Sequence, residues 1–351
     1  MNWLNCCLAF AVLGAAATAA EPPAQPGQCV VRIGGQVLDP TTHAIVAPDT
    51  PTAQEMCAAN DLQAHLELLT GKKLPVVADG KLGGQTPLVV GKAVATLKKL
   101  GVEVDFAGLG AEGVLIRTQG PALVLAGNQR GALYAAYSFL EDHCGCRWFA
   151  PECTVIPKTG TFDIKDLSVR HLPPLEYRAT DYPKSRDANW AVRNKLNGTQ
   201  TALDEPRGGK ISYSHFVHTF NDILNPAQHF AAHPEYFSMI NGKRVGGNTQ
   251  LCLTNPEVLE IAKKTVRRWI QEAPQATIFS VSQNDWHNFC TCPACAALDA
   301  KEGSHAGTLL HFVNAIARDI AKDHPDKLID TLAYQYTRTP PKEVKAEPNV
   351  T

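Results

Sequence analysis

Residues 276–295 read ATIFSVSQNDWHNFCTCPAC, and this stretch indicates the fold class of the second half of the chain. It begins with a short β-branched and aromatic run, which is typical of a buried strand in a parallel sheet. The run is followed at once by polar and aromatic residues, Gln283, Asn284, Asp285 and Trp286. An apolar strand that delivers an acid and amides at its carboxyl end is how barrel enzymes build active sites.

Strands and helices are expected on both sides of this stretch. Helical spacing of apolar residues predicts helices at residues 53–70, 131–142, 187–196 and 305–323, and one that starts at Pro256 after Asn255 as its N-cap. Strands are expected at residues 28–38, 87–90, 114–117, 122–127, 175–180, 211–214, 236–240, 250–253 and 328–334.

The order of these elements predicts an α/β protein with two domains. Residues 21–165 form a small α/β domain, and residues 166–351 alternate strand and helix in the manner of a (β/α)8 TIM-like barrel. Only about four or five βα units are present, where a closed barrel needs eight. We therefore expect the first part of a barrel, truncated at the C-terminus.

Composition and the N-terminus favour an exported protein that acts on neutral substrates. The 351 residues carry a net charge of -1 and 19% charged residues, so a nucleic-acid partner has no electrostatic support. Residues 1–20 contain a short apolar core followed by small residues, which predicts a signal peptide and a secreted or periplasmic location. No later stretch reaches transmembrane length, so no integral membrane segment is expected after cleavage.

Cysteines are the second chemical feature of residues 276–295. Cys290, Cys292 and Cys295 have metal-like spacing, and His287 is a candidate fourth ligand of a structural zinc site. Export instead favours disulfides, and free thiols are the third alternative. No metal and no cofactor is assigned to the predicted active site.

Five segments together resemble bacterial proteins that carry the domain of unknown function 4838, which overlaps glycoside hydrolase family 163. They are residues 131–151 (GALYAAYSFLEDHCGCRWFAP), 215–221 (HFVHTFN), 233–237 (HPEYF), 250–256 (QLCLTNP) and 280–295 (SVSQNDWHNFCTCPAC). The resemblance implies a first domain similar to the N-terminal domains of family 20 hexosaminidases and family 67 glucuronidases, ahead of a TIM-like barrel. It also implies endo-β-N-acetylglucosaminidase activity on complex N-glycans, with a glycan as the partner.

The resemblance gives the acid and amide pair a reaction. Glycoside hydrolysis needs an acid to protonate the leaving oxygen, and a substrate 2-acetamido group can serve as the nucleophile of a retaining, substrate-assisted mechanism. We expect Asp285 to be the general acid and Asn284 or Gln283 to contact the acetamido group or a hydroxyl. Trp286 is expected to stack on a sugar face. The alternative is structural: Asp285 caps the next helix and Asn284 ties down the loop.

Five further residues are candidates for the same site. His215 and His218 follow a predicted strand and are candidates for sugar contact or for tuning the acid. Asp181 and Tyr334 lie at the ends of predicted strands and are candidate substrate ligands, and Glu235 is the second candidate acid.

Two other functions remain open. A non-catalytic carbohydrate-binding or scaffold protein would keep the fold with an incomplete site. A hydrolase of another sugar, such as a uronic acid, would need a basic cluster, for which Arg178, Lys184 and Arg186 are available.

Overall fold

The computed structural model describes residues 27–351, so the predicted signal peptide at residues 1–20 lies outside the described residues. The chain divides into two compact units. Among the described residues, unit 1 consists of residues 27–51, Glu55–Arg147 and Thr154–His171, and unit 2 consists of Thr52–Gln54, Trp148–Cys153 and Leu172–Thr351.

Unit 1 is built on a six-stranded mixed sheet in the order β11-β6-β7-β5-β3-β4. Strands β4, β3, β5 and β7 run parallel to one another, β6 is antiparallel to β7, and β11 is antiparallel to β6. The strands are β3 (His43–Ala47), β4 (Val76–Ala78), β5 (Thr86–Val90), β6 (Val114–Gln119), β7 (Ala122–Gly127) and β11 (Ser168–His171).

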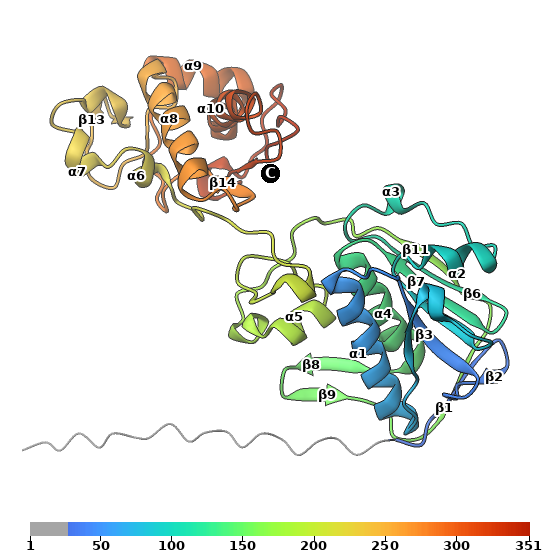
Figure 1. Ribbon diagram of the computed structural model, residues 1–351. Coiled ribbons are helices and arrows are strands. Elements are labelled where there is room, and N and C mark those ends of the chain that lie inside the picture. The colour runs from blue at the N-terminus through green and yellow to red at the C-terminus, as the bar shows by residue number, and fades with distance from the viewer. Residues whose placement is uncertain (1–26) are drawn as a thin grey trace, which may run out of the picture. The chain divides into compact units, whose positions relative to one another are not determined.

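Helices cover both faces of this sheet (Figure 1). On one face, Val46, Val89 and Val124 of the sheet pack with Leu97 of α2 in a single buried cluster. The other face is covered by the two long helices. The helices are α1 (Ala53–Thr70), α2 (Val94–Lys99), α3 (Phe106–Leu109) and α4 (Arg130–Cys144).

Shorter strands complete the first half of the chain. β1 (Val30–Ile33) pairs with β2 (Gln36–Val37) and, in parallel, with β10 (Thr161–Ile164), and β8 (Arg147–Ala150) pairs with β9 (Cys153–Val155). The predicted strand at residues 28–38 is therefore two strands. Gly34 and Gly35, with φ of 53° and 82°, make the turn between them.

Unit 2 contains four adjacent parallel segments. β14 (Ile278–Ser280) pairs in parallel with β15 (Leu328–Asp330), Tyr213 forms a parallel bridge with Ile278, and Ile329 forms one with Val350. The other elements are α5 (Ala188–Arg193), α6 (Phe220–Ile223), α7 (Pro226–His229), β12 (Met239–Ile240), β13 (Lys243–Arg244), α8 (Pro256–Glu272), α9 (Pro293–Glu302) and α10 (His305–Ile320). Single 3-10 turns along the whole chain are η1 (Asp79–Lys81), η2 (Pro183–Arg186), η3 (Glu205–Arg207), η4 (Pro234–Tyr236) and η5 (Gln335–Thr337).

One face of these parallel segments packs on α8 and α10. The buried cluster contains Phe279 and Ile329 from the strands with Trp269 and Ile316 from the helices. Strand, helix and parallel strand in this order are the units of which (β/α) barrels are made. The described residues form four parallel segments and no closed barrel, so the chain is a mixed α/β protein and the complete barrel stays a prediction.

The strand predicted at residues 175–180 is wrong. Asn197 pairs with the backbone of this segment instead: its side-chain oxygen accepts from the Arg178 amide at 2.8 Å. The amides of Asn197 and Gly198 both donate to the Arg178 carbonyl. Because these groups are already paired, the segment runs as loop. The predicted strand at residues 211–214 is reduced to the bridge at Tyr213.

Asn255 caps α8 as the sequence predicts. Its side-chain oxygen accepts from the amides of Glu257 at 2.9 Å and Val258 at 3.4 Å. We expect Asn255→Ala to lower the free energy of unfolding by about 1 kcal/mol, because those two amides lose their acceptor. Urea unfolding measures this difference. Asn255→Asp, which keeps the acceptor, is the control and should unfold close to the wild-type midpoint; equal losses in both variants would contradict the capping role.

Candidate active site

The predicted site lies just beyond the end of β14. Residues Ser282, Gln283 and Asn284 are buried, and Asp285 is the first exposed residue of the stretch. The chain turns here from strand to loop, so the amide side chains and the acid are not confined to opposite faces of one strand.

Gln283 uses its amide nitrogen inside the protein. The two N–H groups of this nitrogen are shared among three acceptors: the Leu332 carbonyl at 3.2 Å, the Tyr334 carbonyl at 3.1 Å and the Thr337 hydroxyl at 2.7 Å. Its side-chain oxygen is buried and has no hydrogen-bond partner among the described residues. Gln283 therefore anchors the loop after β15, and because its side chain is fully buried it offers no surface to a ligand in this structure.

Asn284 is fixed by hydrogen bonds to neighbouring side chains and backbone. Its amide nitrogen donates to Asn221 Oδ1 at 3.0 Å and to the Thr249 carbonyl at 2.9 Å. Its backbone amide donates to Gln250 Oε1 at 2.9 Å. Both side-chain N–H groups are thus used, which leaves the side-chain oxygen as the group that can contact a substrate.

Trp286 belongs to the same fixed loop. Its indole N–H donates to the Thr249 carbonyl at 2.8 Å, and its own carbonyl accepts from Gln250 Nε2 at 2.6 Å. The side chain is half-buried, so part of the ring stays available for stacking.

Asp285 does not cap the following helix. α9 starts at Pro293 with Cys292 as its N-cap, and the Asp285 carboxylate accepts from Gln335 Nε2 at 2.8 Å. The structural alternative for Asp285 is therefore wrong, whereas the alternative for Asn284, as a residue that ties down the loop, agrees with its contacts. The Asp285 carboxylate is thus exposed, and Gln335 donates to one of its oxygens.

His218 and Tyr334 lie in the same group. His218 Nδ1 is 2.8 Å from the Gln283 carbonyl, and the His218 ring centroid is 5.8 Å from that of Tyr334, which is 41% exposed. Val217 and His218 both have positive φ, 33° and 56°, which costs about 1–3 kcal/mol for each non-glycine residue. Strain of this kind concentrates at functional sites.

His215 is not brought to this group. Its ring stacks on the buried Trp269 of α8, with ring centroids 3.9 Å apart, and burial lowers the pKa of the imidazole. This contact places His215 in the packing between β14 and the helices.

Glu235 and Asp181 have hydrogen-bond partners outside the group around Gln283 and Asn284. Glu235 is exposed and 3.0 Å from His233 Nδ1, and hydrogen bonds from its own backbone amide and from His233 lower the pKa of its carboxyl. That direction is opposite to what a general acid needs. Asp181 is exposed and accepts from Gln200 at 3.2 Å.

Asp330 is a further carboxylate, and it is not among the site residues predicted from the sequence. It ends β15, is 9% exposed, and accepts from Ser280 Oγ at 2.8 Å and from the Tyr213 hydroxyl at 3.2 Å. Burial raises the pKa of Asp330 and also that of Tyr213. A buried carboxyl with a raised pKa at a strand end is a functional candidate. The sequence could have indicated Asp330, because it is an acid within the predicted strand at residues 328–334, and Asp285 is likewise an acid next to a predicted strand.

The raised pKa of Asp330 predicts a pH dependence of stability. The folded carboxyl holds its proton above the ordinary value of 3.8, so its contribution is complete below that pH and is lost as pH rises through the folded pKa. We expect the unfolding free energy of the wild type to fall relative to Asp330→Asn over this range. Urea unfolding at successive pH values measures the difference; a difference that is constant with pH would contradict the argument.

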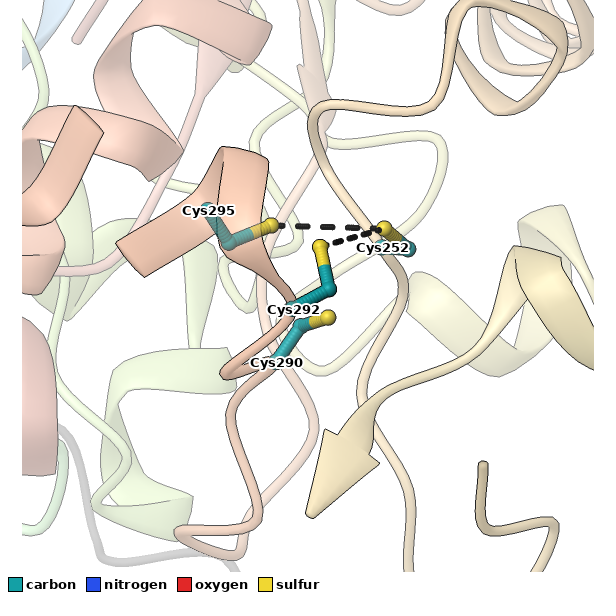
Figure 2. Close-up of side chains that lie close together, drawn as sticks. All are labelled: Cys252, Cys290, Cys292 and Cys295. Carbon is teal, nitrogen blue, oxygen red and sulfur yellow. Dashed lines mark hydrogen bonds between the residues drawn. The ribbon is translucent and has the colours of Figure 1, made fainter. Parts of the chain in front are cut away.

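The three cysteines of the loop meet a fourth one. Cys290, Cys292 and Cys295 lie with Cys252, and all four are buried (Figure 2). His287, the predicted fourth ligand, is exposed, and its ring lies 6.4 Å from that of Tyr336. Sequence spacing could not suggest Cys252, because it lies on a distant segment ahead of α8.

The fold and the site together define a two-unit α/β protein with polar groups gathered at the end of a parallel strand. Residues 148–351 match the family described as domain of unknown function DUF4838. The chain belongs to this family, as its sequence motifs indicate. No curated protein is similar to the chain at a significant level. Among the residues that the structure describes, no helix is both long and apolar enough to cross a membrane.

Several solved structures are similar to the chain at low identity. One is the family GH115 4-O-methyl-alpha-glucuronidase BtGH115A, with 13% identity, a TM-score of 0.46, and coverage of 86% of this chain and 43% of the other. A mutant Streptomyces plicatus beta-hexosaminidase in complex with its product GlcNAc has 12% identity, a TM-score of 0.41, and coverage of 88% and 64%. The Flavobacterium johnsoniae chitobiase has 11% identity, a TM-score of 0.42, and coverage of 84% and 49%. The chain thus spans less than two thirds of each of these proteins.

Proposed function

We propose that the protein is a glycoside hydrolase that is secreted or periplasmic and cleaves glycans containing N-acetylglucosamine. The observation that carries the proposal is the setting of Asp285: an exposed carboxylate beyond a parallel strand, on a loop whose neighbouring residues are fixed by hydrogen bonds. A reacting acid needs such a rigid support.

In the proposed mechanism Asp285 protonates the leaving oxygen. A glycan that covers the carboxylate withdraws it from water, and desolvation favours the protonated form that a general acid needs. Gln335, which donates to the same carboxylate, keeps it oriented.

The substrate acetamido group is proposed as the nucleophile, so that the reaction retains the anomeric configuration. Its N–H needs an acceptor, and Asn284 has only its side-chain oxygen left to offer. Trp286 and Tyr334 supply the aromatic surface against which a sugar ring can pack.

Direct assay tests the proposal. Full-length protein is incubated with complex N-glycans and, separately, with oligosaccharides that contain uronic acid, and the products are identified by mass spectrometry. Release of fragments ending in N-acetylglucosamine supports the proposal. Release of uronic acid alone, or binding of either glycan without cleavage, would contradict it in favour of another sugar or of a binding protein.

A uronidase has less support from the basic residues. The Arg178 guanidinium donates to the carbonyls of Lys195 at 2.7 Å and Leu175 at 2.5 Å, and Lys184 pairs with Glu152. Two of the three predicted carboxylate ligands are therefore already engaged within the protein.

A further inference from the structure

Four buried thiols form one compact group in unit 2. Their sulfur atoms all lie within 4.8 Å of one another, and the side chains are between 1% and 6% exposed. Figure 2 shows the side chains of Cys252, Cys290, Cys292 and Cys295 converging from two separate segments. We propose that this group binds one zinc ion as a closed, structural site with four cysteine ligands.

The spacing of the sulfur atoms fits a tetrahedral ion. Zinc–sulfur bonds of about 2.3 Å in tetrahedral geometry put neighbouring sulfurs about 3.8 Å apart. Cys252 Sγ lies 3.7 Å from Cys292 Sγ and 4.0 Å from Cys295 Sγ. One sulfur is thus close to two others at the edge length of a tetrahedron, whereas a disulfide joins each sulfur to one partner at about 2.0 Å.

The surroundings supply donors that stabilise bound thiolates. The Met239 amide lies 3.3 Å from Cys290 Sγ, and Arg244 Nη1 lies 3.6 Å from the same sulfur. The Thr254 hydroxyl is 3.2 Å from Cys295 Sγ. Four thiolates and one divalent ion leave two negative charges, so N–H and O–H donors and a guanidinium are the neighbours that such a site requires.

The ligand set selects the metal class. Four sulfurs in a tetrahedral arrangement suit zinc or iron, and hard cations such as magnesium and calcium prefer oxygen. With four protein ligands and a buried setting, no position is open for a water or a substrate, which is the pattern of a structural zinc site. The ion therefore holds segments together and takes no part in the hydrolysis proposed above.

The segments that it joins carry the candidate active site. Cys252 lies two residues after Gln250, whose side chain is hydrogen-bonded to the backbone of both Asn284 and Trp286. The other three cysteines follow Trp286: Cys290 and Cys292 lie on the same loop, and Cys295 lies in the first turn of α9. The ion would thus fix the loop that carries Asp285, by joining the segment of Cys252 to the residues that follow Trp286.

The wild-type protein decides the first part of the test. After purification without added metal or reductant, elemental analysis should find one zinc ion per chain, and X-ray absorption at the zinc edge should give four sulfur neighbours at about 2.3 Å. Thiol titration in denaturant with chelator should find all four cysteines reduced. Disulfides among these cysteines, iron in place of zinc, or absence of bound metal would each overturn the proposal.

Matched serine variants complete the test. Cys252→Ser should lose the bound zinc, and Cys153→Ser, which changes an exposed cysteine outside the group, should keep it. Chelator should lower the melting temperature of the wild type and of Cys153→Ser equally. Full zinc retention in Cys252→Ser would contradict the assignment, and if that variant does not fold, the wild-type measurements alone decide.

Discussion

Asp285→Asn is expected to reduce glycan cleavage by about a hundred- to ten-thousand-fold, because asparagine keeps the shape of the side chain but cannot donate a proton to the leaving oxygen. The folded loop should survive the change, since the Asp285 side chain is exposed and its hydrogen bond with Gln335 lies at the surface. The variant should therefore still bind the glycan, and comparison of kcat with the dissociation constant separates the two effects. Wild-type turnover in Asp285→Asn would remove Asp285 from the mechanism.

Two further carboxylates serve as comparisons for this variant. Glu235→Gln changes an exposed group that is paired with His233, and it should cleave at nearly the wild-type rate. Asp330→Asn tests the buried acid that contacts Ser280 and Tyr213. Loss of cleavage in Asp330→Asn with normal cleavage in Asp285→Asn would move the acid to the end of β15 while leaving the class of reaction in place.

Gln283→Glu is expected to cost about 3 kcal/mol or more of unfolding free energy at neutral pH. The change replaces an N–H donor by a carboxylate oxygen that faces the carbonyls of Leu332 and Tyr334. Each carbonyl then loses one of its donors and keeps the Thr337 hydroxyl, and a charge is buried against two carbonyl oxygens. Burial raises the pKa of such a carboxyl, so the penalty should shrink as pH falls and the protonated form donates again.

The exposed Gln228 of α7 gives a matched control. Gln228→Glu makes the same chemical change on the surface and should leave unfolding within about 0.5 kcal/mol of the wild type. Urea unfolding of both variants at acidic and neutral pH measures the effect. Equal stability of Gln283→Glu and Gln228→Glu at neutral pH would show that Gln283 does not anchor the loop after β15.

Much of the fold follows from local patterns. The predicted ranges 53–70 and 122–127 coincide with α1 and β7, because helical spacing and a continuous apolar run each specify one structure. β3 was not predicted, although all five of its residues are buried. Its sequence, HAIVA, is short and carries a histidine, and only its place between β5 and β4 makes it a central strand.

The sequence predicts where the candidate site lies, but not which contacts hold its residues. Strand β14 and the exposed acid after it follow from sequence, but the roles of Gln283 and Asn284 depend on partners from distant segments, Thr337 and Asn221 among them. His215 was predicted near the acid because it follows a strand, and its stacking on Trp269 could not be foreseen from spacing. Cys252 was missed for the same reason.

The connectivity of the two units sets an order in which they can fold. β6 and β7 are joined by the tight turn at Gly120 and Pro121, so their antiparallel ladder closes a short loop at small entropic cost. Each parallel pairing of β14 must instead wait until one or more helices have been synthesised and folded back. On the ribosome, the sheet of unit 1 can therefore form early, whereas the four parallel segments of unit 2 can all be paired only after Val350 has emerged.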